Sequence, residues 1–139
     1  MSIQDSLEIN DKVGIALIAH DGKKADLVAF VMKRLNFFND DRVVLYGTGT
    51  TSQHLRNAGI DKINSLASGP LGGDAQIASR IVENDIQVVI FFRDPLGKHP
   101  HEVDISMLMR QCDVHGIPLA SNYSTAKMLT SYIKRKMKK

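Results

Sequence analysis

Three aspartates and two histidines stand in short polar segments that follow apolar runs. They are Asp21, Asp74, Asp104, His20 and His101. Carboxylates and imidazoles brought together in one site can supply general acid–base chemistry. Each aspartate taken alone is more commonly a helix N-cap, so this interpretation depends on a fold that brings them together. No histidine pair has the H-x-x-x-H spacing of a metal site, which favours chemistry without a metal ion.

Two glycine-rich segments offer backbone amides to an anion. The first, Gly47 to Thr51 (G-T-G-T-T), adds three hydroxyl groups at the start of a predicted helix, which suits a phosphate. Lys24 is placed to neutralise that phosphate, which favours phosphate binding over a plain turn with N-capping threonines. The second, Ser68 to Asp74, contains three glycines and one proline, so its backbone can approach a ligand closely. The chain has no G-x-x-x-x-G-K-[ST] loop, and Ser52 replaces the third glycine of a dinucleotide motif, which weakens ATP and NAD interpretations.

Apolar runs and helical repeats alternate along the chain. The apolar runs predict strands at 13–19, 43–46, 63–66, 88–92 and 117–120. Apolar residues at helical spacing predict helices from about 23, over 50–58, from 77, over 105–112 and around 129–137. This alternation predicts an α/β fold with one parallel sheet, helices on both faces and right-handed crossovers. Ligands of such sheets bind beyond the carboxyl ends of the strands, so we expect the polar segments that follow four strands to meet at one edge.

The composition is that of a globular protein without a membrane segment. The chain has 139 residues, 43% hydrophobic and 24% charged, and we expect one domain over 1–139 with a flexible polar extension at 1–11. The longest apolar runs are too short to span a bilayer and the first residues are not signal-like. We therefore expect a cytoplasmic protein that has no membrane contact.

The net charge of +3 comes from the C-terminal tail. Five of the 18 basic residues lie in the last six positions, which leaves 13 basic against 15 acidic residues elsewhere. We interpret the tail as a solvated helix end and expect no nucleic-acid partner, because nucleic-acid binders usually spread positive charge over a face. The single cysteine, Cys112, shares a helical stripe with Ile105, Leu108 and Met109, and we expect it to be buried and structural.

Five motifs of the chain resemble those of methylglyoxal synthase. They occur in the family's order, with compatible spacing, between residues 12 and 125. The motifs are I-A-L-I-A-H-D at 15–21 with Lys24, Y-G-T-G-T-T at 46–51, S-G-P-L-G-G-D at 68–74, F-F-R-D-P-L at 91–96 and P-H-E-V-D at 100–104. Five motifs in one order are far more specific than any single glycine-rich loop.

The resemblance implies a fold, an activity and an assembly. The fold is a single-domain, three-layer α/β/α sandwich with a mostly parallel five-stranded sheet of flavodoxin-like type. The activity is that of a carbon–oxygen lyase that needs no metal or cofactor and converts dihydroxyacetone phosphate to methylglyoxal and inorganic phosphate through an enediolate. The assembly is a homo-oligomer, typically a hexamer, with phosphate as product and allosteric inhibitor. The family's phosphate-binding arginine comes from the C-terminus of a neighbouring subunit, and only Arg135 is available for that role here.

The matching positions imply roles in the reaction. Asp74 matches the base that removes a proton from the carbon beside the carbonyl. His101 matches the group that hydrogen-bonds the carbonyl oxygen, and the amide of Gly69 would meet the developing enediolate. Asp21 and Asp104, with the histidine at position 20, would hold this network in its working protonation state.

A second group of matching positions implies substrate binding. Its phosphate cradle consists of Lys24, Thr48, Thr50, Thr51 and Ser68. Three further residues are expected to touch the substrate: His20, Gly69 and His101. Such a site would hold the substrate by its phosphate while one of its carbons loses a proton.

Two alternatives share the expected fold. A non-catalytic module that binds a phosphate or a nucleotide, like the regulatory domain of carbamoyl phosphate synthetase, needs a phosphate cradle but no base. The presence of Asp74 together with His101 and Asp104 favours the enzyme. An IMP cyclohydrolase would normally belong to a longer two-domain chain, so the length of 139 residues disfavours it.

Overall fold

The computed structural model describes residues 12–67, 72–97 and 105–137, and in this part of the chain one parallel sheet forms the centre. Its five strands are β1 (Val13–Ala19), β2 (Val43–Thr48), β3 (Asn64–Leu66), β4 (Val88–Phe92) and β5 (Leu119–Ala120). They lie in the order β3-β2-β1-β4-β5, and every neighbouring pair is parallel.

The two central strands are apolar along their whole length because both of their faces are covered. All residues of β1 and β4 are buried. In register, Leu17 of β1 pairs with Gly47 of β2 on one side and with Ile90 of β4 on the other. A continuous apolar run is what a parallel strand between two helical layers requires.

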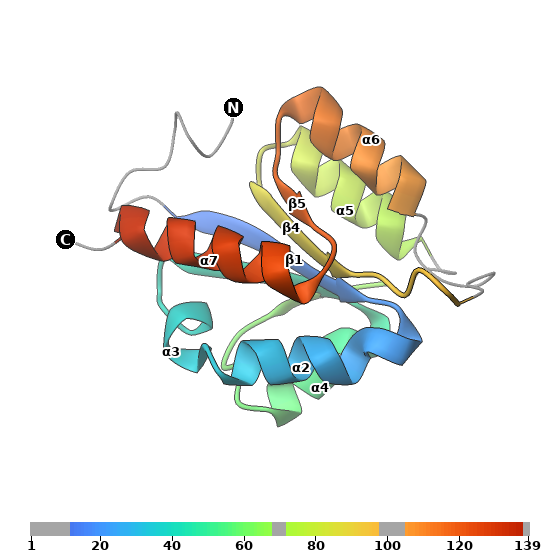
Figure 1. The fold of residues 1–139 in the computed structure, drawn as a ribbon. Helices are drawn as coiled ribbons and strands as arrows, with labels where there is room; N and C mark the ends of the chain where they lie inside the picture. The colour runs from blue at the N-terminus through green and yellow to red at the C-terminus, as the bar shows by residue number, and fades with distance from the viewer. Residues whose placement is uncertain (1–11, 68–71, 98–104, 138–139) are drawn as a thin grey trace.

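Helices cover both faces of the sheet (Figure 1). One layer contains α2 (Lys24–Met32), α4 (Gly49–Asn57) and α7 (Tyr123–Met137), with the short α3 (Leu35–Phe38) beside them. The other layer contains α5 (Gly73–Val82) and α6 (Ile105–His115). A 3-10 turn, η1 (Asp21–Lys23), joins β1 to α2. The predicted α/β/α sandwich is therefore confirmed, and the sheet is entirely parallel in the described residues.

The strand order reverses at the centre of the sheet. The chain moves from β1 to β2 and β3 on one side, and then crosses back to β4 and β5 on the other. The three layers match the flavodoxin-like expectation, whereas the order 3-2-1-4-5 differs from the 2-1-3-4-5 of flavodoxin. Because the order reverses between β1 and β4, their carboxyl ends form the switch point at which open α/β sheets bind ligands.

Some elements differ in detail from the sequence expectation. The helix that starts near residue 23 ends at Met32, and a separate turn of helix holds the aromatic pair Phe37 and Phe38. Val82 and Met109 fit the apolar stripes of their helices but are exposed, because Ile81 and Leu108 already fill the contact between these helices and the sheet.

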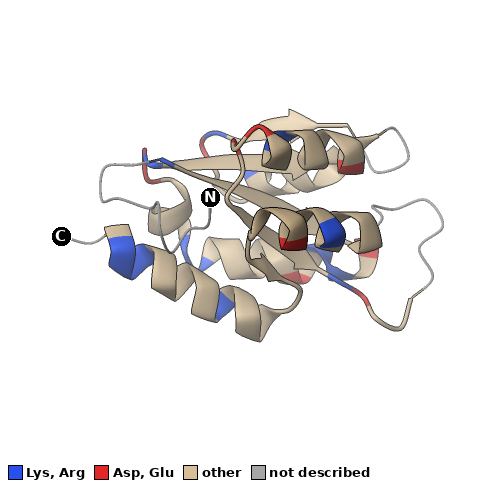
Figure 2. Ribbon diagram, turned by 90° about the horizontal axis from the view of Figure 1, so that it is seen from above, with Lys and Arg blue, Asp and Glu red and all other residues tan. Residues whose placement is uncertain are grey.

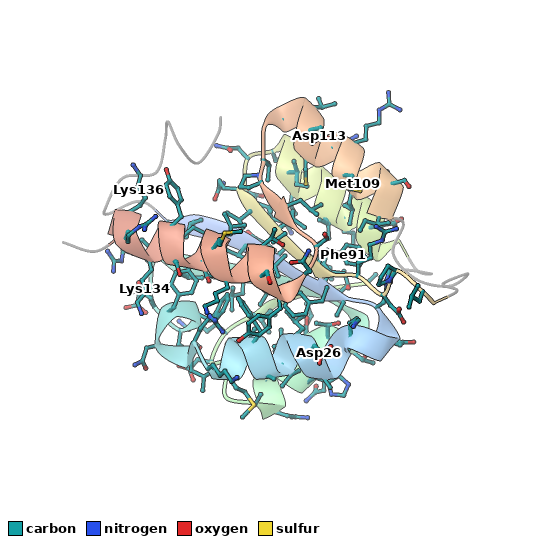
Figure 3. The ribbon with its side chains drawn as sticks, in the orientation of Figure 1. Asp26, Phe91, Met109, Asp113, Lys134 and Lys136 are labelled. Atoms are coloured by element: carbon teal, nitrogen blue, oxygen red, sulfur yellow. The ribbon has the colours of Figure 1, made fainter. Side chains whose placement is uncertain are left out.

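Cys112 is buried as expected. Burial raises the pKa of its thiol to about 11, and the neighbouring charge of Asp113 adds to the shift. Figure 3 shows Asp113 and Met109 on the same helix, α6.

Arg42 lies at the amino edge of the sheet, opposite the carboxyl ends of the strands. Its Nη2 and Nε each donate a 3.0 Å hydrogen bond to the Asp40 carboxylate, and its Nη1 donates at 2.9 Å to the carbonyl of Met137. The bonds from Arg42 hold the pKa of the Asp40 carboxyl below its usual range. Because Met137 ends α7, the basic last turn of this helix lies at the amino edge, where Figure 2 shows its Lys and Arg residues near the C terminus.

Candidate active site

The expected site residues that the structure describes lie at the carboxyl edge of the sheet. The described part of the chain includes seven of them: His20, Asp21, Lys24, Thr48, Thr50, Thr51 and Asp74. The other four lie outside the described residues: Ser68, Gly69, His101 and Asp104. The expected extension at 1–11 lies outside them as well.

Lys24 connects the end of β1 to the start of α4. It is the first residue of α2, and its ammonium Nζ donates a 2.8 Å hydrogen bond to Oγ1 of Thr50 and a 2.5 Å bond to Oδ1 of Asp21. Its side chain is 22% exposed, whereas that of Asp21 is 74% exposed. The ammonium is thus held over the first turn of α4 while its carboxylate partner remains in contact with solvent.

The first turn of α4 is built to accept an anion. Thr48 and Thr51 are buried, and Thr48, the N-cap residue, makes no side-chain capping hydrogen bond. Backbone N–H groups in the first turn of a helix have no partner within the helix. These amides, the partial positive charge of the helix end and the Lys24 ammonium therefore converge on one point, which suits a phosphate dianion.

His20 lies at the switch point between β1 and β4. It is 3% exposed, its ring packs edge-on against Phe91 with 5.0 Å between centroids, and its backbone N–H donates to the carbonyl of Phe92. The backbone N–H of Asp94 donates a 2.9 Å hydrogen bond to Nδ1 of this imidazole. Since a backbone amide can only donate, Nδ1 carries no proton, and the neutral ring presents Nε2–H as its donor.

Asp74 stands in the first turn of α5. The N-cap of this helix is Gly72, whose φ of 95° is a left-handed conformation that glycine adopts at little cost. The carboxylate is partly exposed, and its Oδ1 accepts a 2.8 Å hydrogen bond from the backbone N–H of Ala75. A carboxylate held at the edge of the site and open to solvent can take up a proton.

Comparisons with known proteins agree with the fold and identify the family. The family model of the MGS-like domain matches residues 27–121. Methylglyoxal synthase from Carboxydothermus hydrogenoformans is 50% identical over 82% of this chain and 93% of its own length, and that from Geobacillus sp. is 46% identical over 87% and 85%. The crystal structure of methylglyoxal synthase from Elizabethkingia anophelis superposes with a TM-score of 0.82 at 38% identity, covering 90% of this chain and 80% of the other.

The chain belongs to the methylglyoxal synthase family. The relatives that match most of this chain are named methylglyoxal synthase. The comparisons therefore support an enzyme, a lyase, over the regulatory module of the same fold. Within residues 12–67, 72–97 and 105–137, no helix combines the length and apolar character needed to cross a membrane.

Two features of this methylglyoxal synthase site were not predicted from the sequence. The amide of Asp94 fixes the tautomer of His20, and the side chain of Gln76 reaches back from α5 to the residue after β3. Asp94 stands two residues after β4, and the sequence does not show that β4 lies beside β1. Gln76 carries no signal in the sequence, because a glutamine in a first helical turn is ordinary.

The donor set of the described residues suits a phosphate better than a metal ion. In that part of the chain no three His, Cys, Asp or Glu side chains are grouped so that they could hold a metal. The groups at the start of α4 are an ammonium, hydroxyls and helix amides, which are hydrogen-bond donors to an anion.

Proposed function

We propose that the chain catalyses the elimination of phosphate from dihydroxyacetone phosphate, which gives methylglyoxal and inorganic phosphate without a metal or cofactor. The observation that carries this proposal is the Lys24 ammonium, held 2.8 Å from Thr50 Oγ1 at the uncapped start of α4. This phosphate cradle lies at the same sheet edge as Asp74, a carboxylate free to accept a proton.

Binding begins at the phosphate. Lys24 and the first-turn amides of α4 take the dianion. The hydroxyls of Thr48, Thr50 and Thr51 and Nε2–H of His20 are proposed to donate hydrogen bonds to its oxygens. Ser68 and Gly69 are proposed to complete the cradle from the segment before α5. A ligand held by its phosphate then presents its three carbons toward the start of α5.

Proton transfer starts the reaction. Asp74 removes a proton from the hydroxymethyl carbon, the electrons of that C–H bond form the carbon–carbon double bond, and the carbonyl oxygen becomes an enediolate. His101 and the amide of Gly69 are proposed to stabilise this oxygen, with Asp21 and Asp104 keeping the network in its working protonation state.

Elimination completes the reaction. The carbon that lost its proton becomes the aldehyde: its hydroxyl proton passes to the phosphate, the double bond shifts to the methylene carbon, and the carbon–oxygen bond to phosphate breaks with its electron pair leaving on phosphate. The enolate that remains takes the proton held by Asp74 on its methylene carbon and becomes methylglyoxal. The cradle favours elimination over reprotonation if it holds the carbon–oxygen bond to phosphate perpendicular to the enediolate plane. In that orientation the π electrons of the enediolate can displace the phosphate.

We also propose that residues 1–139 form one cytoplasmic domain. The protein assembles as a homohexamer and is inhibited by phosphate. Arg135 stands at the amino edge of its own sheet, twelve residues or about 18 Å along α7 from Tyr123. It could therefore meet only the phosphate of a neighbouring subunit, as the family's C-terminal arginine does.

The test is to incubate the purified protein with dihydroxyacetone phosphate in the presence of a metal chelator, and to measure methylglyoxal and phosphate together. We expect the two products to appear in equal amounts and at the same rate. Release of neither product, or of phosphate without methylglyoxal, would contradict the proposal. An Asp113→Asn variant, changed on the exposed side of α6, serves as the active control.

A further inference from the structure

Gln76 joins the end of β3 to the start of α5. Its side-chain Oε1 accepts a 2.7 Å hydrogen bond from the backbone N–H of Ala67, the residue that directly follows β3. Its own backbone N–H donates at 3.0 Å to the carbonyl of Gly72, the N-cap of α5. One residue is thus bonded both to the strand exit and to the helix start.

Among the described residues, few other contacts hold the first turn of α5 against β3. The Asp74 side chain bonds the adjacent amide of Ala75, which is a contact within the turn itself. The N-cap residue Gly72 has no side chain with which to cap the helix, and Ile77, one residue after Gln76, packs this helix against the sheet. The packing of Ile77 sets the distance between the helix and the sheet. The Gln76 bond sets the position of the first turn of the helix relative to the end of β3.

We infer that Gln76 is a positioning residue of the active site, which fixes the carboxylate of Asp74 against the end of β3. This inference rests on the proposed role of Asp74 as the base. The Lys24, Thr48 and Thr50 side chains belong to other elements, α2, β2 and α4, and do not depend on this bond. Gln76 should therefore govern proton transfer and leave phosphate binding unchanged.

The expected effect is on turnover. A base must lie within hydrogen-bonding reach of the carbon it deprotonates, and a misplacement of about 1 Å can cost about 100-fold in rate. Gln76 is exposed, so loss of its bond leaves the Ala67 amide free to bond water and should cost little stability. A residue that acted only in folding would show the reverse, with stability lost and turnover per folded molecule kept.

The first experiment compares two glutamine-to-leucine variants of the full chain. Gln76→Leu removes the acceptor, and Gln53→Leu is the matched control, because Gln53 is also exposed on a helix and bonds Asn57 at 3.0 Å. We expect Gln76→Leu to lower kcat about 10- to 100-fold, with KM and the Kd of inorganic phosphate within about threefold of wild type. The Gln53→Leu variant should keep wild-type kcat. Wild-type kcat in Gln76→Leu would overturn the inference.

The second experiment tests the bond itself. Gln76→Glu keeps an acceptor of the same reach and should restore kcat to within about fivefold, whereas Gln76→Asn is one methylene too short and should behave like Gln76→Leu. Amide hydrogen exchange at Ala67 should be faster in Gln76→Leu and Gln76→Asn than in wild type, whether or not the protein has the proposed activity. Equal loss of kcat in Gln76→Glu and Gln76→Leu, or unchanged exchange at Ala67, would show that Gln76 does not position the base. If the wild-type protein itself released no methylglyoxal, the proposed function would fail, while the exchange result would still report on the bond.

Discussion

The two halves of the proposed active site are held in different ways. The proposed phosphate-binding half, which comprises His20, Lys24, Thr48, Thr50 and Thr51, has three buried side chains and stands at the ends of the neighbouring strands β1 and β2. Hydrogen bonds join its residues to other elements: Lys24 bonds Thr50 of α4, and His20 bonds Asp94, which stands after β4. The proposed base half, the first turn of α5 with Asp74, is partly exposed, and the Gln76 side chain bonds it to the residue after β3.

This difference indicates that phosphate binding and proton transfer depend on separate parts of the site. A phosphate dianion needs several donors fixed before it arrives, and donors that are already in place lose little entropy on binding. A base must instead exchange its proton with solvent or with the product in each cycle, which a partly exposed carboxylate can do. The two halves should therefore respond separately to mutation.

The largest effect is expected at the base. Asp74→Asn removes the proton acceptor at unchanged size and should lower kcat by about 100- to 10,000-fold, the range typical of a general base. Steady-state rates measured at saturating substrate check this. Asp113→Asn on α6 should remain fully active. A kcat within tenfold of wild type in Asp74→Asn would show that another group removes the proton.

The second effect concerns the cradle. Lys24→Met removes a charge-assisted hydrogen bond while keeping the length of the side chain, and such bonds contribute about 1.5–3 kcal/mol. We expect KM to rise about 10- to 150-fold, measured against the exposed control Lys62→Met. If kcat fell and KM stayed constant, Lys24 would act in the chemical step instead.

The third effect tests how tightly the cradle is packed. A Cβ on Gly47 would lie 2.6 Å from Oγ of Ser52, which is fully buried and has no hydrogen-bond partner in the described residues, and 2.9 Å from the flexible end of Ile63. Gly47→Ala should lower the free energy of unfolding by about 1–3 kcal/mol, and adding Ser52→Ala should recover most of it. Urea unfolding of both single variants and the double variant measures the coupling. Additive effects would mean that the two residues do not meet.

The smallest effect is expected away from both halves, at Cys112. With its pKa raised to about 11, the thiol is protonated at neutral pH, so only about one molecule in a thousand carries a thiolate at pH 8. Iodoacetamide at that pH should leave the folded protein unmodified and active. Because an unfolded thiol ionises at lower pH, the folded state should lose stability as the pH rises from about 9 to about 11. Rapid alkylation of native protein at pH 8 would contradict the burial of this side chain.

The sequence predicted the features that follow from periodicity and motif. Continuous apolar runs indicated β1 and β4 because strands covered on both faces have no polar side, and the motifs indicated Lys24, Thr50 and Asp74. The strand order could not be predicted, because apolar periodicity does not say which strand lies beside which. The Asp94 to His20 bond depends on that order, since it joins residues 74 positions apart across the switch point.

The burial of individual helical residues could not be predicted from periodicity either. The exposed Val82 and Met109 fit a helical stripe as well as the buried Ile81 and Leu108 do, and only the docking of α5 and α6 on the sheet separates them. Gln76 is similar, because its role depends on the distance between Ala67 and the first turn of α5, which no local pattern records.

Inorganic phosphate binding to Asp74→Asn tests most directly whether binding and proton transfer reside in separate halves. Isothermal titration of the wild-type, Asp74→Asn and Lys24→Met proteins gives the three dissociation constants under one set of conditions. We expect Asp74→Asn to bind phosphate as tightly as wild type or more tightly, because a negative charge near the anion is removed, and Lys24→Met to bind at least about tenfold more weakly. Weakened binding in Asp74→Asn, or wild-type binding in Lys24→Met, would contradict this account.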